Sequence, residues 1–302
     1  MDRLRLLEVF CAVVDAGSLA GAGKALALSP PAVTRAVAML EERLGVRLLQ
    51  RTTRSLHLTE AGARFLESAR RLIADLDEAE RSAAGATAIP SGHLRLTAPL
   101  TFGRMHLMPI LAGFLAERPR VTASLVTLDR ITNLIEEGFD LAVRIAHLPD
   151  STLVVRCVGE VRRLLVASPA YLARAGMPAR PEELRHHEVI ALDSMFASGE
   201  WRHAVDGQVR SIRLVAPRLT VNDALAAIMA AERGEGITAV LSYMVAPQLA
   251  AGTLVVVLGS YAPPAIPVQL VYPQSRLLAA KVRAFVDYAT PRLARVLAEA
   301  VS

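Results

Sequence analysis

The spacing of apolar residues predicts three short helices at the start of the chain. Apolar residues recur at helical intervals from about residue 2 to 16, and Gly17 follows as a helix end. A second helix is expected after Ser18, which suits a helix N-cap. Ser29 can cap a third helix, which opens on two prolines whose missing N–H groups cost nothing in a first helical turn. The stretch that ends at Arg35 therefore predicts two helices joined by a tight turn.

The third helix is expected to have one apolar and one polar side. Its core stripe is predicted to contain Val33, Val37, Leu40 and Leu44. The outward side of its first turns carries Pro31, Thr34 and Arg35, and no acidic residue precedes Glu41. An arginine can bond guanine O6 and N7, and a threonine offers a hydroxyl and a methyl group. This face is typical of a recognition helix in the DNA major groove.

Residues 46–59 predict a basic wing after this helix. Apolar residues alternate on both sides of the polar tip QRTTRS, at Val46, Leu48, Leu56 and Leu58. From Arg43 to Arg54 the chain carries four arginines and no acid: Arg43, Arg47, Arg51 and Arg54. Such a tip can bind phosphates or enter the minor groove. The alternative is a three-helix packing module with a solvated arginine face.

Residues 59–84 predict a long helix, with Thr59 and Glu60 at its start, one apolar stripe and an opposite face dense in charge. A long helix of this kind is typical of pairing with a second copy. The alternative is packing against its own chain. Residues 85–92 are small and include one proline, which predicts a hinge.

Residues 93–302 alternate between strand and helix patterns, which indicates parallel α/β architecture. Strands at 93–98, 121–128 and 139–145 predict a first lobe, and strands at 162–168, 186–192, 236–240 and 253–258 predict a second. A strand at 266–273 and an amphipathic helix at about 275–299 can return to the first lobe. Lobe I would then comprise about 93–161 and 266–302, and lobe II about 162–265.

Composition fits this picture without deciding it. A chain of 302 residues, 53% hydrophobic and 21% charged, is expected to fold into two or three domains. The net charge of +5 weakly favours a polyanionic partner. Cys11 and Cys157 match no metal spacing and are predicted to be buried free thiols. No export signal or bilayer-spanning run is visible, so we expect a cytoplasmic, nucleoid-associated protein without a membrane partner.

The sequence carries no recognisable catalytic motif. It lacks GxSxG, HExxH, a Walker loop and cysteine-pair metal motifs, so no catalytic residue, metal site or cofactor is predicted. His186, His187 and Glu188 are adjacent in a segment that leads into a strand, and neighbouring strand residues cannot converge on one metal. The alternative function is a solute-binding or enzymatic α/β protein with an accessory helical domain.

Several segments together resemble the LysR-type transcriptional regulators. The winged helix-turn-helix of that family resembles SPPAVTRAVAMLEERLGVRLLQRTTR and LTEAG, and its effector domain resembles GHLRLTAP, EEGFDLAVRI, ASPAYLARAGMP and GEGITAVLSYMV. The DR pair at 129–130 is similar to one subfamily. The sequence departs from the family at Pro30, where many members carry glutamine, and at Leu49, where phenylalanine is usual. Base readout is thereby expected to depend more on Thr34, Arg35 or DNA shape.

The resemblance implies an α+β multidomain fold. It would comprise an N-terminal winged helix-turn-helix domain (1–58), a linker and dimerisation helix (59–84), a hinge (85–92) and a two-lobed, periplasmic-binding-protein-like effector domain (93–302). The implied partners are double-stranded DNA with an interrupted dyad operator, a small-molecule effector, a second copy in a homodimer or homotetramer, and RNA polymerase.

The resemblance also assigns candidate site residues. Those implied for DNA are Ser29, Pro30, Pro31, Thr34, Arg35, Arg51, Thr52 and Arg54. A ligand between the lobes would be held at strand ends and helix starts, where free amides favour anions. The candidates there are Thr101, Thr127, Arg144, Phe196 and Asn222, with Arg144 the natural partner of a carboxylate. Each has a structural alternative: a helix cap for Thr101 and Asn222, a surface ion pair for Arg144 and a core position for Phe196.

Overall fold

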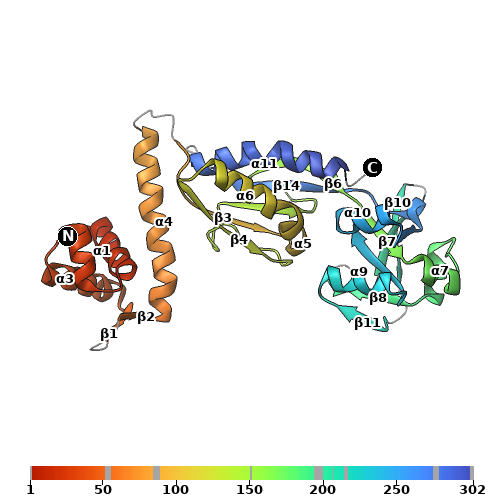
Figure 1. Ribbon diagram of the computed structural model, residues 1–302, viewed down its shortest axis with the longest axis horizontal. Coiled ribbons are helices and arrows are strands. Elements are labelled where there is room, and N and C mark those ends of the chain that lie inside the picture. The colour runs from red at the N-terminus through yellow and green to blue at the C-terminus, as the bar shows by residue number, and fades with distance from the viewer. Residues whose placement is uncertain are drawn as a thin grey trace. The chain divides into compact units, whose positions relative to one another are not determined.

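A computed structural model describes most of the chain in two compact units (Figure 1). The units are Met1–Ile89 and Pro90–Ser302. The residues described are 2–51, 56–83, 89–149, 152–193, 200–205, 207–213, 217–274 and 279–299. Among these residues, none of the helices combines the length and the apolar character that a bilayer span requires.

The three predicted N-terminal helices are confirmed as α1 (Arg3–Asp15), α2 (Leu19–Leu26) and α3 (Pro30–Leu44). Ser18 Oγ accepts the Gly21 amide at 3.0 Å, and Ser29 Oγ accepts the Ala32 amide at 3.4 Å. Gly45 ends α3 with a left-handed backbone, φ 67°. Ala27 closes α2 in the same conformation, φ 55°, without the help of a glycine.

The core of this unit contains most of the predicted stripe of α3. Val33, Val37 and Leu40 are buried with Phe10 of α1. The prediction for Leu44 is wrong, because its side chain is 40% exposed. Glu41, one turn earlier, is buried instead. The reason is that the Glu41 carboxylate accepts hydrogen bonds from the backbone amides of Leu48 and Leu49, so Glu41 and not Leu44 is drawn to the interior.

The wing consists of β1 (Leu49–Arg51) paired antiparallel with β2 (Leu56–Leu58). Its tip, 52–55, lies outside the described residues. The predicted first strand began too early, since Val46 is 42% exposed and precedes β1. The chain enters the strand only after Leu48, where Glu41 binds the backbone.

Helix α4 (Glu60–Ala83) begins where the sequence predicts. Thr59 Oγ1 accepts the Gly62 amide at 2.9 Å and donates to the Arg47 carbonyl at 2.8 Å. The first half of α4 packs against α1, with the Phe10 and Phe65 rings 5.8 Å apart. Packing against its own chain therefore accounts for this half. Further along, the side chains of Leu72 and Leu76 are exposed, and pairing with a second copy stays a prediction.

The first sheet of the second unit has the strand order β4-β3-β5-β14-β6. The strands are β3 (Gly92–Ala98), β4 (Val121–Thr127), β5 (Leu141–Ile145), β6 (Leu153–Val161) and β14 (Ile266–Pro273). Strand β3 is parallel to β4 and β5, but β14 runs antiparallel to both β5 and β6. The prediction of a parallel lobe is therefore corrected to a mixed sheet. The chain returns from the second lobe through β14, which inserts between β5 and β6.

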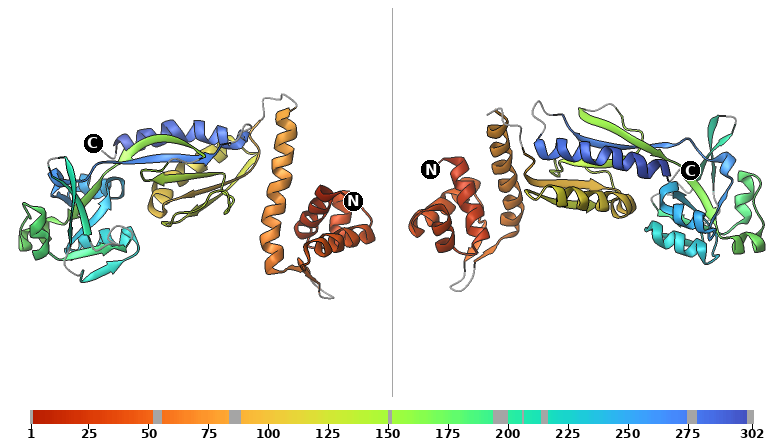
Figure 2. Two further views of the ribbon diagram at one scale, coloured as in Figure 1. Left: turned by 180° about the vertical axis from the view of Figure 1, so that it is seen from behind. Right: turned by 45° about the horizontal axis from the view of Figure 1, so that its top comes forward.

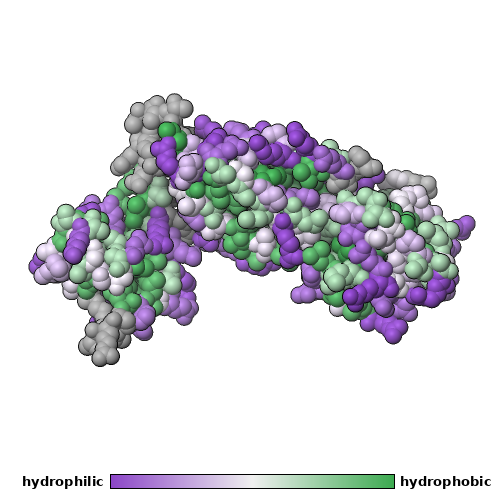
Figure 3. All heavy atoms as spheres, in the orientation of Figure 1, coloured by the Kyte–Doolittle hydropathy of each residue, from purple (hydrophilic) through white to green (hydrophobic). Residues whose placement is uncertain are grey.

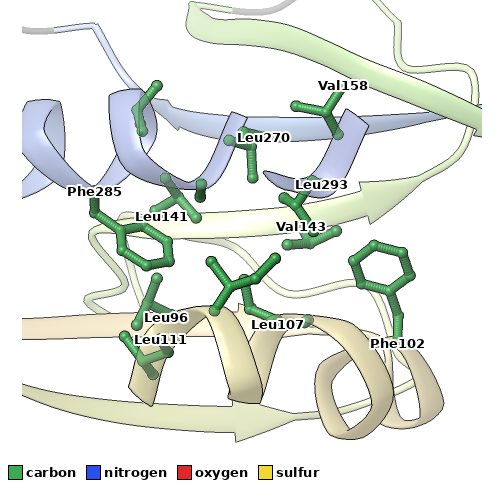
Figure 4. Packing of buried hydrophobic residues seen from close by; sticks show 14 of the residues in the cluster. Leu96, Phe102, Leu107, Leu111, Leu141, Val143, Val158, Leu270, Phe285 and Leu293 are labelled. Carbon is green, nitrogen blue, oxygen red and sulfur yellow. The ribbon is translucent and has the colours of Figure 1, made fainter. Parts of the chain in front are cut away.

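One continuous helical stretch and the C-terminal helix cover the same face of this sheet. The stretch comprises α5 (Leu100–Phe102), the π-helical turn η1 (Gly103–Leu107) and α6 (Met108–Glu117), and the C-terminal helix is α11 (Ala280–Glu299). Figure 4 shows Phe285 and Leu293 of α11 directed toward Leu141 and Val143, with Leu107 on the other side of this cluster. The outward side of α11 is hydrophilic (Figure 3), which confirms the predicted amphipathic helix.

The second sheet has the order β11-β8-β12-β7-β13. Its strands are β7 (Arg163–Ala167), β8 (Val189–Leu192), β11 (Leu219–Val221), β12 (Ile237–Leu241) and β13 (Val255–Val257). Strand β8 is parallel to β11 and β12, whereas β7 is antiparallel to β12 and β13. Around it lie α7 (Pro169–Ala175), η2 (Pro181–His186), α9 (Ala224–Glu232), α10 (Ser242–Ala251) and η3 (Gly259–Tyr261). Figure 2 shows these elements from two further sides.

A separate hairpin of β9 (Glu200–Val205) and β10 (Gln208–Arg213) was not predicted. Its strands mix apolar residues with charged and polar ones, so neither forms the apolar run by which the other strands were recognised. The lobes are joined where β6 leads into β7. There the Ser242 amide donates to the Arg162 carbonyl at 2.8 Å, and the Arg162 amide donates to Ser242 Oγ at 3.2 Å.

The two cysteines differ in exposure. Cys11 is buried in the core of the first unit, as predicted. The prediction for Cys157 is wrong, because its thiol is exposed. It lies on the edge strand β6, where the next residue, Val158, faces the core.

We expect the two thiols to react at very different rates. Burial raises the pKa of Cys11 to about 11, and only the thiolate attacks a disulfide reagent. At pH 8 its thiolate fraction is then on the order of a hundredfold lower than that of a free cysteine. Titration with an aromatic disulfide should give one fast equivalent, which Cys157→Ser removes. Two fast equivalents in the folded protein would contradict the burial of Cys11.

Candidate functional site

The first candidate surface is the exposed N-terminal side of α3. Pro30, Pro31 and Arg35 are exposed, and Thr34 is half-buried beside them. Thr34 Oγ1 donates to the Pro30 carbonyl at 3.0 Å, so its proton is already used within the helix. Its oxygen can still accept a hydrogen bond, and its methyl group can contact a base. Arg35 is thus the residue on this face that can donate to a base edge.

The first acidic residue of α3, Glu41, is turned inward, and the next, Glu42, is exposed only near the C-terminal end of the helix. Glu41 Oε1 accepts the Leu48 amide at 2.8 Å and the Leu49 amide at 3.0 Å. Its other oxygen lies 3.8 Å from an Arg47 nitrogen. One buried carboxylate therefore fixes the first wing strand to the recognition helix and removes negative charge from the outer surface.

A second backbone contact joins the wing to α4. A Cβ atom at Gly62 would lie far inside contact distance of the Leu48 carbonyl oxygen. The start of α4 can approach the wing only because residue 62 has no side chain. Leu48 is thus held from two sides, by Glu41 at its amide and by α4 at its carbonyl.

The second candidate site is a cavity of about 240 Å³ in the Pro90–Ser302 unit. It lies where the strands of both lobes end. The first lobe contributes Pro99, Thr101, the segment 128–131, Arg144, Ile145, Ala146 and Ile266. The second lobe contributes Arg163, Leu192, Ala224, Leu241, Tyr243 and Met244. The wall thus combines three arginines and one aspartate, Asp129, with apolar side chains.

Two of these arginines already have partners. Arg130 makes a bidentate pair with Glu137, at 2.9 and 2.6 Å, which raises the pKa of Arg130 and lowers that of Glu137. Arg144 donates to the carbonyl and the hydroxyl of Thr132. Burial lowers the pKa of Arg144, and the charge of Glu137 opposes that shift. Both arginines therefore help to hold the segment 128–139, which packs against β5 through Leu134 and Phe139.

Comparison with known sequences separates the same two parts of the chain. Residues 4–63 match the bacterial regulatory helix-turn-helix of the lysR family, and residues 88–294 match the LysR substrate binding domain. The chain belongs to the LysR family of transcriptional regulators. The matched segments contain the recognition helix with its wing and the cavity, respectively.

Relatives of similar length support this assignment. The chain is 36% identical over 293 residues to an HTH-type transcriptional repressor of Pseudomonas aeruginosa, covering 95% of this chain and 91% of the relative. It is 32% identical over 288 residues to the regulator CrgA of Neisseria meningitidis, covering 95% and 96%.

Solved LysR-type structures share the architecture. CrgA of Neisseria meningitidis gives a TM-score of 0.61 at 32% identity, covering 96% of this chain and 98% of that one. The full-length virulence activator AphB of Vibrio cholerae gives 0.60 at 28% identity, covering 95% and 98%. The protein is therefore a LysR-type transcriptional regulator with a helix-turn-helix DNA-binding domain and an effector-binding domain. It is not an enzyme, so the enzymatic alternative is wrong.

The structure brings together only some of the predicted effector residues of this LysR regulator. Thr101 and Arg144 line the cavity. The described lining does not include Thr127, whose methyl group packs where a side chain at Gly103 would lie. Nor does it include Asn222, which is exposed and precedes α9 by two residues.

Several predicted residues fall where the structure is not described. Phe196, Thr52 and Arg54 lie outside the described residues. Arg51 is placed in β1 by its backbone. Among the described residues, no cluster of His, Cys, Asp and Glu is arranged to hold a metal ion.

Sequence reasoning missed the polar residues that the second lobe brings to the cavity. Arg163 begins β7, and Tyr243 follows β12 by two residues. Their positions at strand ends are the same signal by which Thr101 and Thr127 were selected. Asp129 was noted only as a family marker, yet its Oδ1 accepts the Leu100 amide at 2.9 Å and caps α5.

Proposed function

We propose that this regulator reads its operator through the N-terminal turns of α3 and grips the flanking backbone with its basic wing. Arg35 would bond a guanine edge, and the Thr34 methyl group would contact a neighbouring base. Pro30 and Pro31 would shape the entry to the groove, and Ser29 would act as the helix cap. Arg51, Thr52 and Arg54 would contact phosphates or the minor groove. The single observation that carries this proposal is that the exposed first turns of α3 carry no acidic residue and that the first acid of the helix, Glu41, is turned inward.

The long helix and the charge pattern support a paired assembly. Exposed Leu72 and Leu76 on α4 would pair with a second copy, which gives a homodimer or a homotetramer and an operator with an interrupted dyad. The functional division would follow residues 1–58, 59–84, 85–92 and 93–302. The protein would act in the cytoplasm at the nucleoid, where it would contact RNA polymerase.

The cavity would bind the controlling molecule, which we propose to be a small carboxylate. Its wall carries three arginines against one aspartate, and this balance favours an anion. A ligand changes the DNA-binding state only if it binds one arrangement of the protein better than the other. A cavity lined by both lobes meets this requirement, because a change in their relative orientation alters the site.

Arg35→Ala is expected to weaken binding to the protein's own promoter region about 10- to 100-fold, because one bidentate base contact contributes about 1–3 kcal/mol. Arg54→Ala, measured in parallel, should lower both the affinity and its dependence on salt, since a phosphate contact releases counterions. Titration of labelled promoter DNA at several salt concentrations measures both. Arg283→Ala, an exposed arginine on α11, is the control. Unchanged affinity in the Arg35 and Arg54 variants would show that the recognition surface lies elsewhere.

A further inference from the structure

Two polar atoms in the cavity wall have no hydrogen-bond partner among the described residues. They are the hydroxyl of Tyr243 and the Nε of Arg163, both buried. Tyr243 is 1% exposed. Buried polar groups in folded proteins nearly always have partners, and a donor left without one destabilises the structure around it. Both atoms can donate a hydrogen bond, so each lacks an acceptor.

The position of Tyr243 is fixed by packing and not by its hydroxyl. Its ring lies edge-on to Phe102, with centroids 5.2 Å apart and planes at 81°, and to His106, at 5.3 Å and 66°. Although Tyr243 follows a strand of the second lobe, its ring belongs to the core of the first. Packing of the ring therefore holds the hydroxyl at the cavity, where it has no hydrogen-bond partner among the described residues.

Arg163 differs from the other two arginines of the wall. Arg130 is paired with Glu137, and Arg144 with Thr132. Burial and the neighbouring charge of Arg202 lower the pKa of Arg163. An anion in the cavity would oppose this shift.

We propose that Arg163 and the Tyr243 hydroxyl together form the anion-binding end of the cavity, in place of Arg144. This inference rests on the proposed effector function and specifies the residues and the ligand class. The Arg163 Nε–H and the Tyr243 O–H would donate to one carboxylate. Leu128, Ile145 and Leu192 line the same cavity and suit an apolar body about the size of one ring. The carboxylate of Asp129 disfavours a second acidic group, so the ligand is a monocarboxylate.

The test uses matched acids and amides of one shape. Calorimetry on the full chain would compare cyclohexanecarboxylate with cyclohexanecarboxamide, and 3-methylbutanoate with 3-methylbutanamide. We expect at least one acid to bind at least tenfold more tightly than its amide. Arg163→Gln should weaken the binding of that acid at least tenfold, and Tyr243→Phe should weaken it about three- to tenfold. Arg162→Gln, an exposed neighbour outside the cavity lining, should change acid binding less than threefold, and Arg144→Gln should weaken it less than Arg163→Gln does.

Tyr243→Phe serves as the control for folding, because it removes only the unpartnered oxygen. Its midpoint of thermal unfolding should equal or exceed that of the unmodified protein. If Arg163→Gln does not fold, the phenylalanine variant and Arg163→Lys decide the question, and undiminished acid binding in both overturns the proposal. It is also overturned if none of the acids binds, if acid and amide bind equally, or if Arg144→Gln alone abolishes acid binding. Promoter binding is measured separately without acid, so failure of the DNA-binding proposal is distinguishable from failure of this one.

Discussion

Glu41→Ala is expected to destabilise the N-terminal unit by about 2–5 kcal/mol. The substitution leaves the Leu48 and Leu49 amides without their acceptor, and each unpaired buried donor costs about 1–3 kcal/mol. Arg47 contributes little to this value because its ion pair is long and its side chain exposed. Urea unfolding followed by the reactivity of Cys11, in a Cys157→Ser background, reports on this unit alone.

Glu42→Ala supplies the matched control, since Glu42 is exposed on the same helix and should change stability by less than about 0.5 kcal/mol. Promoter affinity should also fall in the Glu41 variant at temperatures where it is still folded, because the first wing strand is no longer fixed to α3. Equal stability of the two variants would mean that Glu41 does not organise the wing.

Gly62→Ala should have the second largest effect, a loss of about 1–3 kcal/mol with at least tenfold weaker promoter binding. The added methyl group would overlap the backbone oxygen of Leu48. Because this oxygen belongs to the main chain, the overlap can be relieved only if the whole helix or the whole wing shifts. This loss of stability is opposite in sign to the effect of helix propensity, which favours alanine over glycine by about 1 kcal/mol.

The matched control is a substitution at the next position, where only helix propensity should matter. Ala63→Gly on the exposed side of α4 should cost about 1 kcal/mol by propensity alone and leave promoter binding unchanged. If Gly62→Ala were instead stabilising, the close approach of α4 to Leu48 would be wrong. The same denaturation and DNA-titration experiments measure both variants.

The elements of the N-terminal unit could be predicted because their signals are local. Ser18, Ser29 and Gly45 act within one turn of their own positions, and a cap is readable without any tertiary structure. The burial of Glu41 could not be predicted, because its partners lie seven and eight residues away and belong to a different element. A glutamate on a helix is ordinarily exposed, and only the folded chain shows the two amides that hold it inside.

In the effector unit, strands were easier to predict than the site. Apolar runs located most strands, but their directions depend on where the chain returns, and β14 made the first sheet mixed. Thr101 and Arg144 were placed at the cavity because strand ends meet there. Tyr243 shares the strand-end position of Thr101, but the crossing of its ring from one lobe into the core of the other has no signature in local sequence.

That arrangement limits how the two lobes can move. The Tyr243 ring is embedded in the first lobe, and the adjoining Ser242 is bonded in both directions to Arg162 at the junction of β6 and β7. Tyr243 lines the cavity, and these contacts would act as a pivot. The lobes can swivel about it, whereas a simple gaping apart would pull an aromatic ring from its core and break two backbone-anchored hydrogen bonds. Binding of a ligand in the cavity would therefore change the rotation of one lobe relative to the other.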